Sequence, residues 1–151
     1  METPNAQELL EKLDFNYYIK LISTYVEVDV NNLTNLITKQ SAIYAYFSGV
    51  LSEAKKASES AEIKISKKEA EIRTDLRLKN TSGKRMTDKS MESIVRLHPL
   101  YEKLQQEQVE CKYKYQLLKN FVDSLEVKKD MLIQLSANSR AETQLYRDTS
   151  N

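Results

Sequence analysis

The chain has 151 residues and a formal charge of +1, with 23 Lys and Arg against 22 Asp and Glu. Two glycines, two prolines and a single cysteine favour long helices with few loops and exclude an internal disulfide. No apolar run reaches the roughly 18 residues of a membrane span, and no signal-peptide pattern opens the chain, so we expect a cytoplasmic protein.

Residues 1–30 are predicted to form a short helical arm. Thr3 followed by Pro4 suits a helix cap and first turn, and the apolar spacing predicts a short helix, then a second one to about Tyr25 and an extended link. Six acidic and two basic residues give this segment a charge of −4. We interpret it as an arm packed on the main body. The alternative is an acidic contact surface for a basic partner or a neighbouring subunit.

A first long helix of about 47 residues is predicted from Asn31 or Asn32 to near Asn80. Its apolar residues recur at spacings of three and four. Five of them are assigned to an interface between copies of the chain: Phe47, Val50, Ala54, Ala57 and Ala61. Gly49 lies inside the pattern and should cost about 1 kcal/mol relative to alanine. Lys68 falls on the same stripe, where it either extends its charge to water or fixes the register.

Asn80–Lys89 contains the second glycine and a cluster of turn-forming residues, so the chain is expected to reverse there. Thr87 suits the cap of a short helix, and Pro99 marks the start of a second long helix that runs to about Arg147. Residues 148–151 are expected to be a loose tail. The apolar stripe of this second helix completes the predicted interface between copies with Leu118, Phe121, Val122, Leu125 and Leu132.

Two helices of matched length joined by a polar turn predict an all-α fold. Residues 31–147 would form a long antiparallel helical hairpin that carries the N-terminal helical arm. The arm is expected to be too short to cover the long apolar stripes, and burying apolar surface is worth about 25 cal/mol per Å². We therefore expect the hairpin to assemble into a helical homo-oligomer, of which a ring is one form.

Catalytic patterns are missing from the sequence. The single histidine, His98, precedes a proline at a helix junction, which favours a capping or surface role. No Cys/His cluster has zinc spacing, no glycine-rich loop could cradle phosphates, and Cys111 falls on the apolar stripe. We therefore predict no catalytic residue, no metal and no cofactor.

Basic residues gather near the expected turn of the hairpin. Between Lys64 and Lys89, nine basic residues stand against four acidic ones, a charge of +5. Repeated around an oligomer, such a cluster could hold single-stranded nucleic acid by releasing counterions. A solvated loop that only keeps the protein soluble is the alternative. The residues assigned to this nucleic-acid interface are Lys64, Lys67, Arg73, Arg77, Lys79, Lys84, Arg85 and Lys89.

Two motifs resemble the UvsY-like recombination mediators of phages. The first motif is Met86-Thr87-Asp88-Lys89 with Ile94, followed by His98-Pro99-Leu100-Tyr101. The second motif is Leu125-Glu126-Val127-Lys128-Lys129-Asp130-Met131-Leu132-Ile133-Gln134-Leu135, followed by Arg140. The resemblance covers roughly residues 31–142. It implies a ring-forming helical protein that binds single-stranded DNA and catalyses no reaction. No DNA-binding residue of that group can be matched individually to this chain.

The resemblance also implies a biological role. Such mediators help a RecA-like recombinase replace a single-strand-binding protein during phage recombination and repair, in the cytoplasm of a bacterial host. Within the second motif, Lys128 and Arg140 are interpreted as surface charges, whereas Lys129 is placed on the apolar stripe. A different class remains open: a structural helical assembly protein, such as a virion component, scaffold or assembly chaperone, which would not bind nucleic acid.

Overall fold

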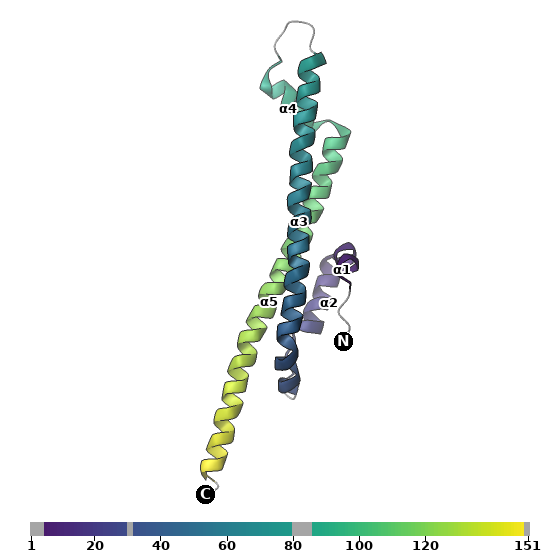
Figure 1. Ribbon diagram of the computed structural model, residues 1–151. Coiled ribbons are helices and arrows are strands. Elements are labelled where there is room, and N and C mark those ends of the chain that lie inside the picture. Colours follow the sequence, from purple (N-terminus) through teal and green to yellow (C-terminus); the bar gives the residue numbers. More distant parts are fainter. Residues whose placement is uncertain (1–4, 30–31, 80–85, 150–151) are drawn as a thin grey trace. The chain divides into compact units, whose positions relative to one another are not determined.

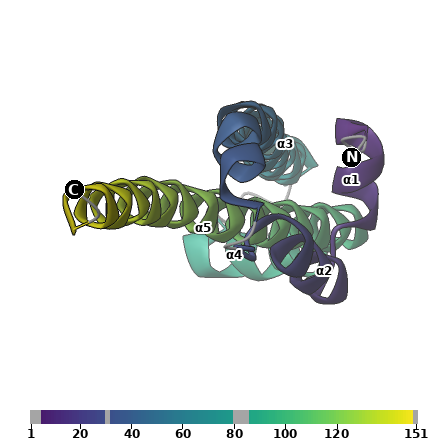
Figure 2. The same cartoon turned by 90° about the horizontal axis from the view of Figure 1, so that it is seen from below.

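In the computed structural model, all regular secondary structure in the described ranges is helical (Figure 1 and Figure 2). These ranges are residues 5–29, 32–79 and 86–149, with side chains described as far as residue 146. They contain the helices α1 to α5 and no strand. The predicted all-α fold class is therefore confirmed.

The chain divides into two compact units, and both long helices contribute to each of them. The first unit joins Met1–Ser52 to Gln116–Asn151, and the second unit is Glu53–Tyr115. The two long helices are α3 (Leu33–Lys79), with 47 residues, and α5 (Pro99–Thr149), with 51. Both long helices were predicted with nearly these bounds, but α5 continues through residues 148 and 149, which were expected to belong to a loose tail. In this division the predicted arm, residues 1–30, belongs to the first unit.

The N-terminal arm folds as two short helices, α1 (Ala6–Lys12) and α2 (Phe15–Tyr25). The residues from 26 to 29 continue without helix or strand. These bounds confirm the predicted pair of helices ending near Tyr25. The predicted cap pair of Thr3 and Pro4 lies outside the described residues.

Side-chain caps set where the two arm helices begin. Asn5 Oδ1 accepts a hydrogen bond from the Gln7 amide at 2.9 Å, and Asp14 Oδ1 accepts one from the Tyr17 amide at 2.7 Å. Such oxygens satisfy amide groups that have no partner within the first turn of a helix. Because Asp14 caps a new helix, the arm is divided into α1 and α2 at this point.

Three aromatic rings from three helices meet in the first unit. Tyr25 of α2 lies 5.1 Å from Phe47 of α3 and 6.4 Å from Phe121 of α5, measured between ring centroids. Phe47 and Phe121 are 4.7 Å apart, and all three pairs are edge-on. Both phenylalanines are 0% exposed. Edge-to-face geometry adds to the stabilisation that their burial supplies.

The arm covers more of the apolar stripes than the sequence suggested. Its buried side chains are Leu9, Leu13, Leu21 and Tyr25. Each fully buried Leu contributes roughly 1.5–3 kcal/mol relative to leaving it exposed. The arm therefore buries part of the stripe in this unit, although Ile37 and Ile133 remain 42% and 60% exposed.

α3 and α5 pack antiparallel in the first unit. Gln40 Nε2 of α3 donates to the Leu125 carbonyl of α5 at 2.8 Å. Further along α3, Phe47 meets Phe121, which comes earlier on α5 than Leu125. The residue numbers rise along one helix as they fall along the other, so the predicted antiparallel pairing holds in this unit.

The second unit contains α4 (Asp88–Arg96) between lengths of the two long helices. Thr87 Oγ1 accepts a hydrogen bond from the Ser90 amide at 3.3 Å, which makes Thr87 the predicted cap. Met91 and Val95 lie four residues apart on α4 and are both buried. This spacing places them on one face of the helix, which fixes the side of α4 that remains in water.

His98 and Pro99 form the junction at which α5 begins. His98 Nδ1 accepts a hydrogen bond from the Leu100 amide at 3.3 Å, and Pro99 is the first residue of the helix. Proline suits this position because its missing N–H would have no partner there. The predicted capping role of His98 and the predicted helix start at Pro99 are both confirmed.

Gly49 should be replaceable by alanine with a gain in stability. It is exposed in the interior of α3, and a Cβ atom built there meets nothing within 4 Å. Because glycine loses more backbone entropy than alanine in a helix, Gly49→Ala should raise the free energy of unfolding by about 1 kcal/mol. Urea unfolding measures this. Ala45→Gly, at an exposed position on the same helix, should lower it by a similar amount, and a Gly49→Ala variant no more stable than the native chain would contradict the expectation.

Candidate nucleic-acid interface

Five of the eight cations assigned to the nucleic-acid interface are exposed and form no ion pair with the described residues. They are Lys64, Lys67, Arg77 and Lys79 on α3 and Lys89 on α4, and we call them the basic cluster. All five belong to the second unit. Cations without an anionic partner can neutralise phosphates without first giving up another interaction. Lys84 and Arg85, also assigned to this interface, lie outside the described residues.

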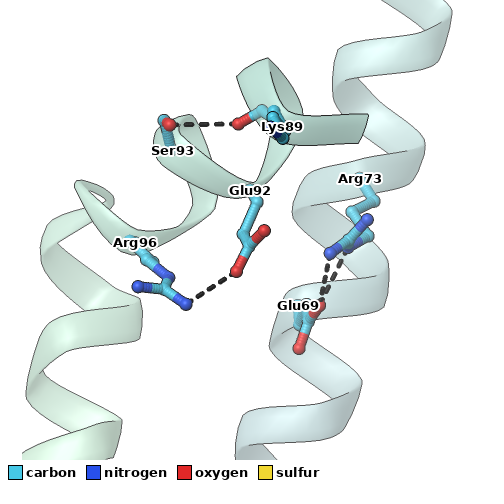
Figure 3. Close-up of polar contacts among 6 residues, drawn as sticks. All are labelled: Glu69, Arg73, Lys89, Glu92, Ser93 and Arg96. Carbon is cyan, nitrogen blue, oxygen red and sulfur yellow. Dashed lines mark hydrogen bonds and ion pairs between the residues drawn. The ribbon is translucent and has the colours of Figure 1, made fainter. Parts of the chain in front are cut away.

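Arg73 differs from the five cations of the basic cluster because it already has a partner. Its Nη2 and Nε atoms lie 2.8 Å and 2.9 Å from Glu69 Oε1 on the preceding turn of α3 (Figure 3). Both side chains are partly buried. A guanidinium held by a carboxylate in this way offers less to a phosphate than the cluster does, so Arg73 is better suited to stabilising α3.

Other acidic residues of the second unit are also paired with nearby cations. On α4, Glu92 Oε1 lies 2.6 Å from Arg96 Nη2, and Figure 3 shows this pair on α4 alongside the Glu69–Arg73 pair on α3. The Ser93 hydroxyl donates to the backbone carbonyl of Lys89 at 3.0 Å, so this hydrogen bond does not involve the Lys89 ammonium group. Glu69, Glu71 and Glu92 are thus paired with Arg73, Lys68 and Arg96, whereas the five cations of the basic cluster form no ion pair with the described residues.

The basic cluster does not occupy a single face of α3. With about 100° between successive residues, Lys64 and Lys67 are about 60° apart, while Lys67 and Arg77 are about 80° apart. Lys64 and Arg73 are on opposite sides of the helix by the same count. The neighbouring pair Lys64 and Lys67 is therefore the part of the cluster most suited to contacting one strand together.

The position of Lys68 agrees with one of its two predicted roles. Its side chain is 25% exposed, and its Nζ atom lies 2.9 Å from Glu71 Oε2, whose own side chain is 64% exposed. The ammonium group thus reaches a carboxylate at the surface from a half-buried position. This is the expected behaviour of a lysine that extends its charge toward water.

Nine of the ten residues assigned to the interface between copies are buried within one chain. They are Phe47, Val50, Ala54, Ala61, Leu118, Phe121, Val122, Leu125 and Leu132. Ala57 is exposed. Packing within the chain already accounts for the burial of the nine, so an interface between copies would have to use other side chains. Exposed apolar candidates on α5 include Val127 and Ile133, which are 61% and 60% exposed.

Lys128 is buried, contrary to the interpretation of it as a surface charge. It is 3% exposed, and its Nζ atom donates to the Tyr25 carbonyl at 2.7 Å and to the Glu27 carbonyl at 3.2 Å. These carbonyls lie at the end of α2 and just beyond it, where a cation is favoured by the helix dipole. Lys128 thus ties the end of α2 to α5. Lys129, which was placed on the apolar stripe, is instead 47% exposed.

Burial gives Lys128 a pH signature. It lowers the pKa of Lys128 below the usual 10.5, so the unfolded chain binds more protons than the folded chain just below pH 10.5, and stability should rise with pH there. Burial raises the pKa of Tyr25 and Tyr46, so these two tyrosines make stability fall as the pH rises above 10. The contribution of Lys128 is therefore best measured as the native chain minus Lys128→Met.

We expect this difference in unfolding free energy to shift in favour of the native chain as the pH rises toward 10.5. Urea unfolding at several pH values measures it, with Lys129→Met as the matched control at a half-exposed neighbouring position. The control should show no comparable trend. A pH-independent difference for Lys128→Met would mean that its charge is not held in a desolvated site.

No group of three or more His, Cys, Asp or Glu residues in the described ranges could hold a metal ion. His98 is used in the helix cap described above, and Cys111 is a half-buried free thiol. No helix in the part of the chain that the structure describes is long and apolar enough to cross a membrane. Comparison with protein-family models, with curated proteins and with solved structures gave no match to this chain.

Proposed function

We propose that this protein is a non-enzymatic, single-stranded-DNA-binding recombination mediator, which helps load a RecA-like recombinase in place of a single-strand-binding protein. The observation that supports it best is the basic cluster: five exposed cations of one unit that have no anionic partner in the described chain. Binding by such a cluster draws its free energy from displaced counterions and does not depend on base sequence. The cellular setting, the cytoplasm of a phage-infected bacterium, comes from the resemblance to UvsY-like mediators.

The distribution of charge between the units favours the same site. Residues 53–115 contain 15 basic and 11 acidic residues, a net charge of +4. The remaining residues contain 8 basic and 11 acidic ones, a net charge of −3. A nearly neutral protein thus concentrates its positive charge in the second unit. Such a local field attracts a polyanion to one unit and leaves the other available for basic partners.

An aromatic side chain of the second unit could add a preference for single strands. Tyr113 of α5 is 42% exposed, and the residue before it, Lys112, is also exposed. Exposed rings beside cations are how non-specific single-strand binders stack unpaired bases, which duplex DNA does not present. The proposed contact therefore combines phosphate neutralisation by the cluster with base stacking by Tyr113.

A mediator of this kind requires several copies to act together. The five cations of one copy bind a strand only weakly. When several copies are linked in an oligomer, binding of the first copy raises the effective concentration of the others at the same strand, so the overall affinity is much higher. The homo-oligomer is therefore part of the proposal. Displacement of a single-strand-binding protein would follow from competition for the same phosphates, and the recombinase would then bind to the exposed strand.

Binding of a fluorescently labelled single-stranded oligonucleotide tests the proposed function. We expect a saturable rise in anisotropy with the full chain at low salt, and weaker binding to a duplex of the same length. The strand should be recovered unchanged, because no reaction is catalysed. Absence of binding at low salt would contradict the proposal.

A second candidate function is a structural helical assembly protein of a virion or its scaffold. The observation that favours it is a pair of exposed apolar side chains on one face of α5, Val127 and Met131, which lie four residues apart and are 61% and 48% exposed. Such side chains are common where proteins meet one another. This candidate requires no affinity for DNA, so the same binding experiment separates it from the mediator.

A further inference from the structure

The end of α2 and one face of α5 border a small open pocket in the first unit. Its volume is about 510 Å³, which is within the usual range of small-molecule pockets. Val127 and Met131 of its lining are 61% and 48% exposed, so apolar groups at the pocket remain in contact with water. The lining is apolar except for one hydroxyl and one cation. It consists of Val26, Val28, Ser124, Val127, Lys128 and Met131.

The ammonium group of Lys128 lies at the wall of this pocket. Its Nζ atom donates to the carbonyls of Tyr25 and Glu27, at 2.7 Å and 3.2 Å. Glu27 stands between Val26 and Val28 in the chain, and both valines line the pocket. The charged end of Lys128 is therefore held against the same short segment that borders the pocket. A lysine ammonium has three N–H groups, so these two hydrogen bonds leave one donor for a further acceptor.

Lys128 is a buried cation that no carboxylate of the described chain neutralises. It is 3% exposed and forms no ion pair with the described residues. Its two carbonyl partners carry partial charges only, so the formal charge of the ammonium persists. The Ser124 hydroxyl is uncharged and already donates to the Asn120 carbonyl at 2.8 Å. Buried charges are usually paired, because an opposite charge recovers much of the free energy that is lost on leaving water. The pocket therefore favours an anion from outside the chain.

We propose that this pocket binds an aliphatic monocarboxylate, with its carboxylate on Lys128 Nζ and its alkyl chain along Val127 and Met131. A single carboxylate matches the one cation of the lining, and it can accept a charge-assisted hydrogen bond from the remaining N–H group. The alkyl chain covers exposed apolar side chains, which gains free energy because apolar surface leaves water.

Anions of higher charge suit the pocket less well. A phosphate ester with two negative charges would meet only one cation there, because no second Lys or Arg belongs to the described lining. The whole lining belongs to the first unit, whereas the basic cluster belongs to the second. Carboxylate binding is therefore separate from the proposed binding of DNA, and neither depends on the other.

Isothermal titration calorimetry of the full chain with octanoate tests the site, and 1-octanol is the neutral probe of the same chain length. Octanoate should bind as a single molecule per chain. It should bind at least about tenfold more tightly than 1-octanol, because only the carboxylate forms a charge-assisted hydrogen bond with Lys128. Lys128→Met should bind both probes equally and keep the native affinity for 1-octanol, which would show that its pocket is intact.

A matched pair of variants tests the site without altering a buried residue. Val127→Asp places a carboxylate at the pocket, where repulsion should weaken octanoate binding at least about tenfold. Ile133→Asp adds the same charge at a 60% exposed position outside the pocket lining, where solvent screening should keep octanoate affinity within about twofold of the native value. Both positions are exposed, so this comparison holds even if Lys128→Met does not fold.

Three results would each overturn the proposal. The first is equal affinity of the native chain for octanoate and 1-octanol. The second is a preference for octanoate that persists in Lys128→Met. The third is equal octanoate affinity in the Val127→Asp and Ile133→Asp variants.

Discussion

Phe121→Ala should lower the free energy of unfolding by about 3–5 kcal/mol. Phe121 is 0% exposed and lies edge-on to both Phe47 and Tyr25, so truncation removes a buried ring and two aromatic contacts. The space left behind is bordered by α3 and α5, which are long helices that can move together only slightly. A loss of this size would be a large fraction of the 5–15 kcal/mol that stabilises an ordinary domain.

Urea unfolding followed by circular dichroism measures this loss, and Val127→Ala is the matched control. Val127 lies on the same helix but is 61% exposed, so its truncation should change stability by less than about 0.5 kcal/mol. If Phe121→Ala and Val127→Ala proved equally mild, the three-ring cluster would not be the centre of the first unit.

Reversing two charges of the basic cluster should weaken binding to single-stranded DNA by at least about tenfold at low salt. The variant is Lys64→Glu with Lys67→Glu. Both side chains are exposed, unpaired and about 60° apart on α3, so one strand can contact both. Loss of two phosphate contacts should also reduce the slope of log K against log salt by about 1.4, because each contact on a single strand contributes about 0.7.

The control for this pair is Lys20→Glu with Lys119→Glu, which changes the net charge equally. Both residues are exposed and belong to the first unit. If affinity depends on where the charge lies, the control should bind almost as the native chain does. Equal losses in the two variants would show that overall charge, and not the basic cluster, governs binding. Unchanged affinity in the Lys64, Lys67 variant would place the DNA site elsewhere.

Local signals in the sequence were sufficient to predict most of the helices. Thr87, His98 and Pro99 act at helix starts through their own side chains and neighbouring amides, so their roles could be read from a few consecutive residues. These three residues also belong to the first motif of the family resemblance. Their structural roles account for that motif's residue types at α4 and α5, without reference to DNA.

Long-range packing could not be predicted in the same way. Tyr25 meets Phe121, which lies 96 residues further along the chain, and only such long-range contacts show that the arm packs on the hairpin. From the sequence, Lys129 was placed on the apolar stripe and Lys128 at the surface, whereas the structure buries Lys128 and exposes Lys129. This difference has a similar origin. The two lysines are adjacent, and both lie close to the apolar stripe; which one is buried depends on where the end of α2 offers its carbonyls.

The candidate site was only partly predictable for the same reason. Composition located the positive charge between residues 64 and 89, but charge counting does not distinguish paired cations from free ones. Glu69, four residues before Arg73, was a visible signal that Arg73 would be paired. Gln40 gave no such signal, because a glutamine among helix-surface residues indicates nothing until its neighbours are known.

The salt dependence of single-strand binding by the native chain tests the proposed function most directly. If each of the five cluster cations neutralises one phosphate, log K measured by fluorescence anisotropy should fall with log salt with a slope of about −3.5 for each bound copy. A steep slope of this order would agree with phosphate contacts by the cluster. Binding that is absent at low salt, or that does not change with salt, would contradict them.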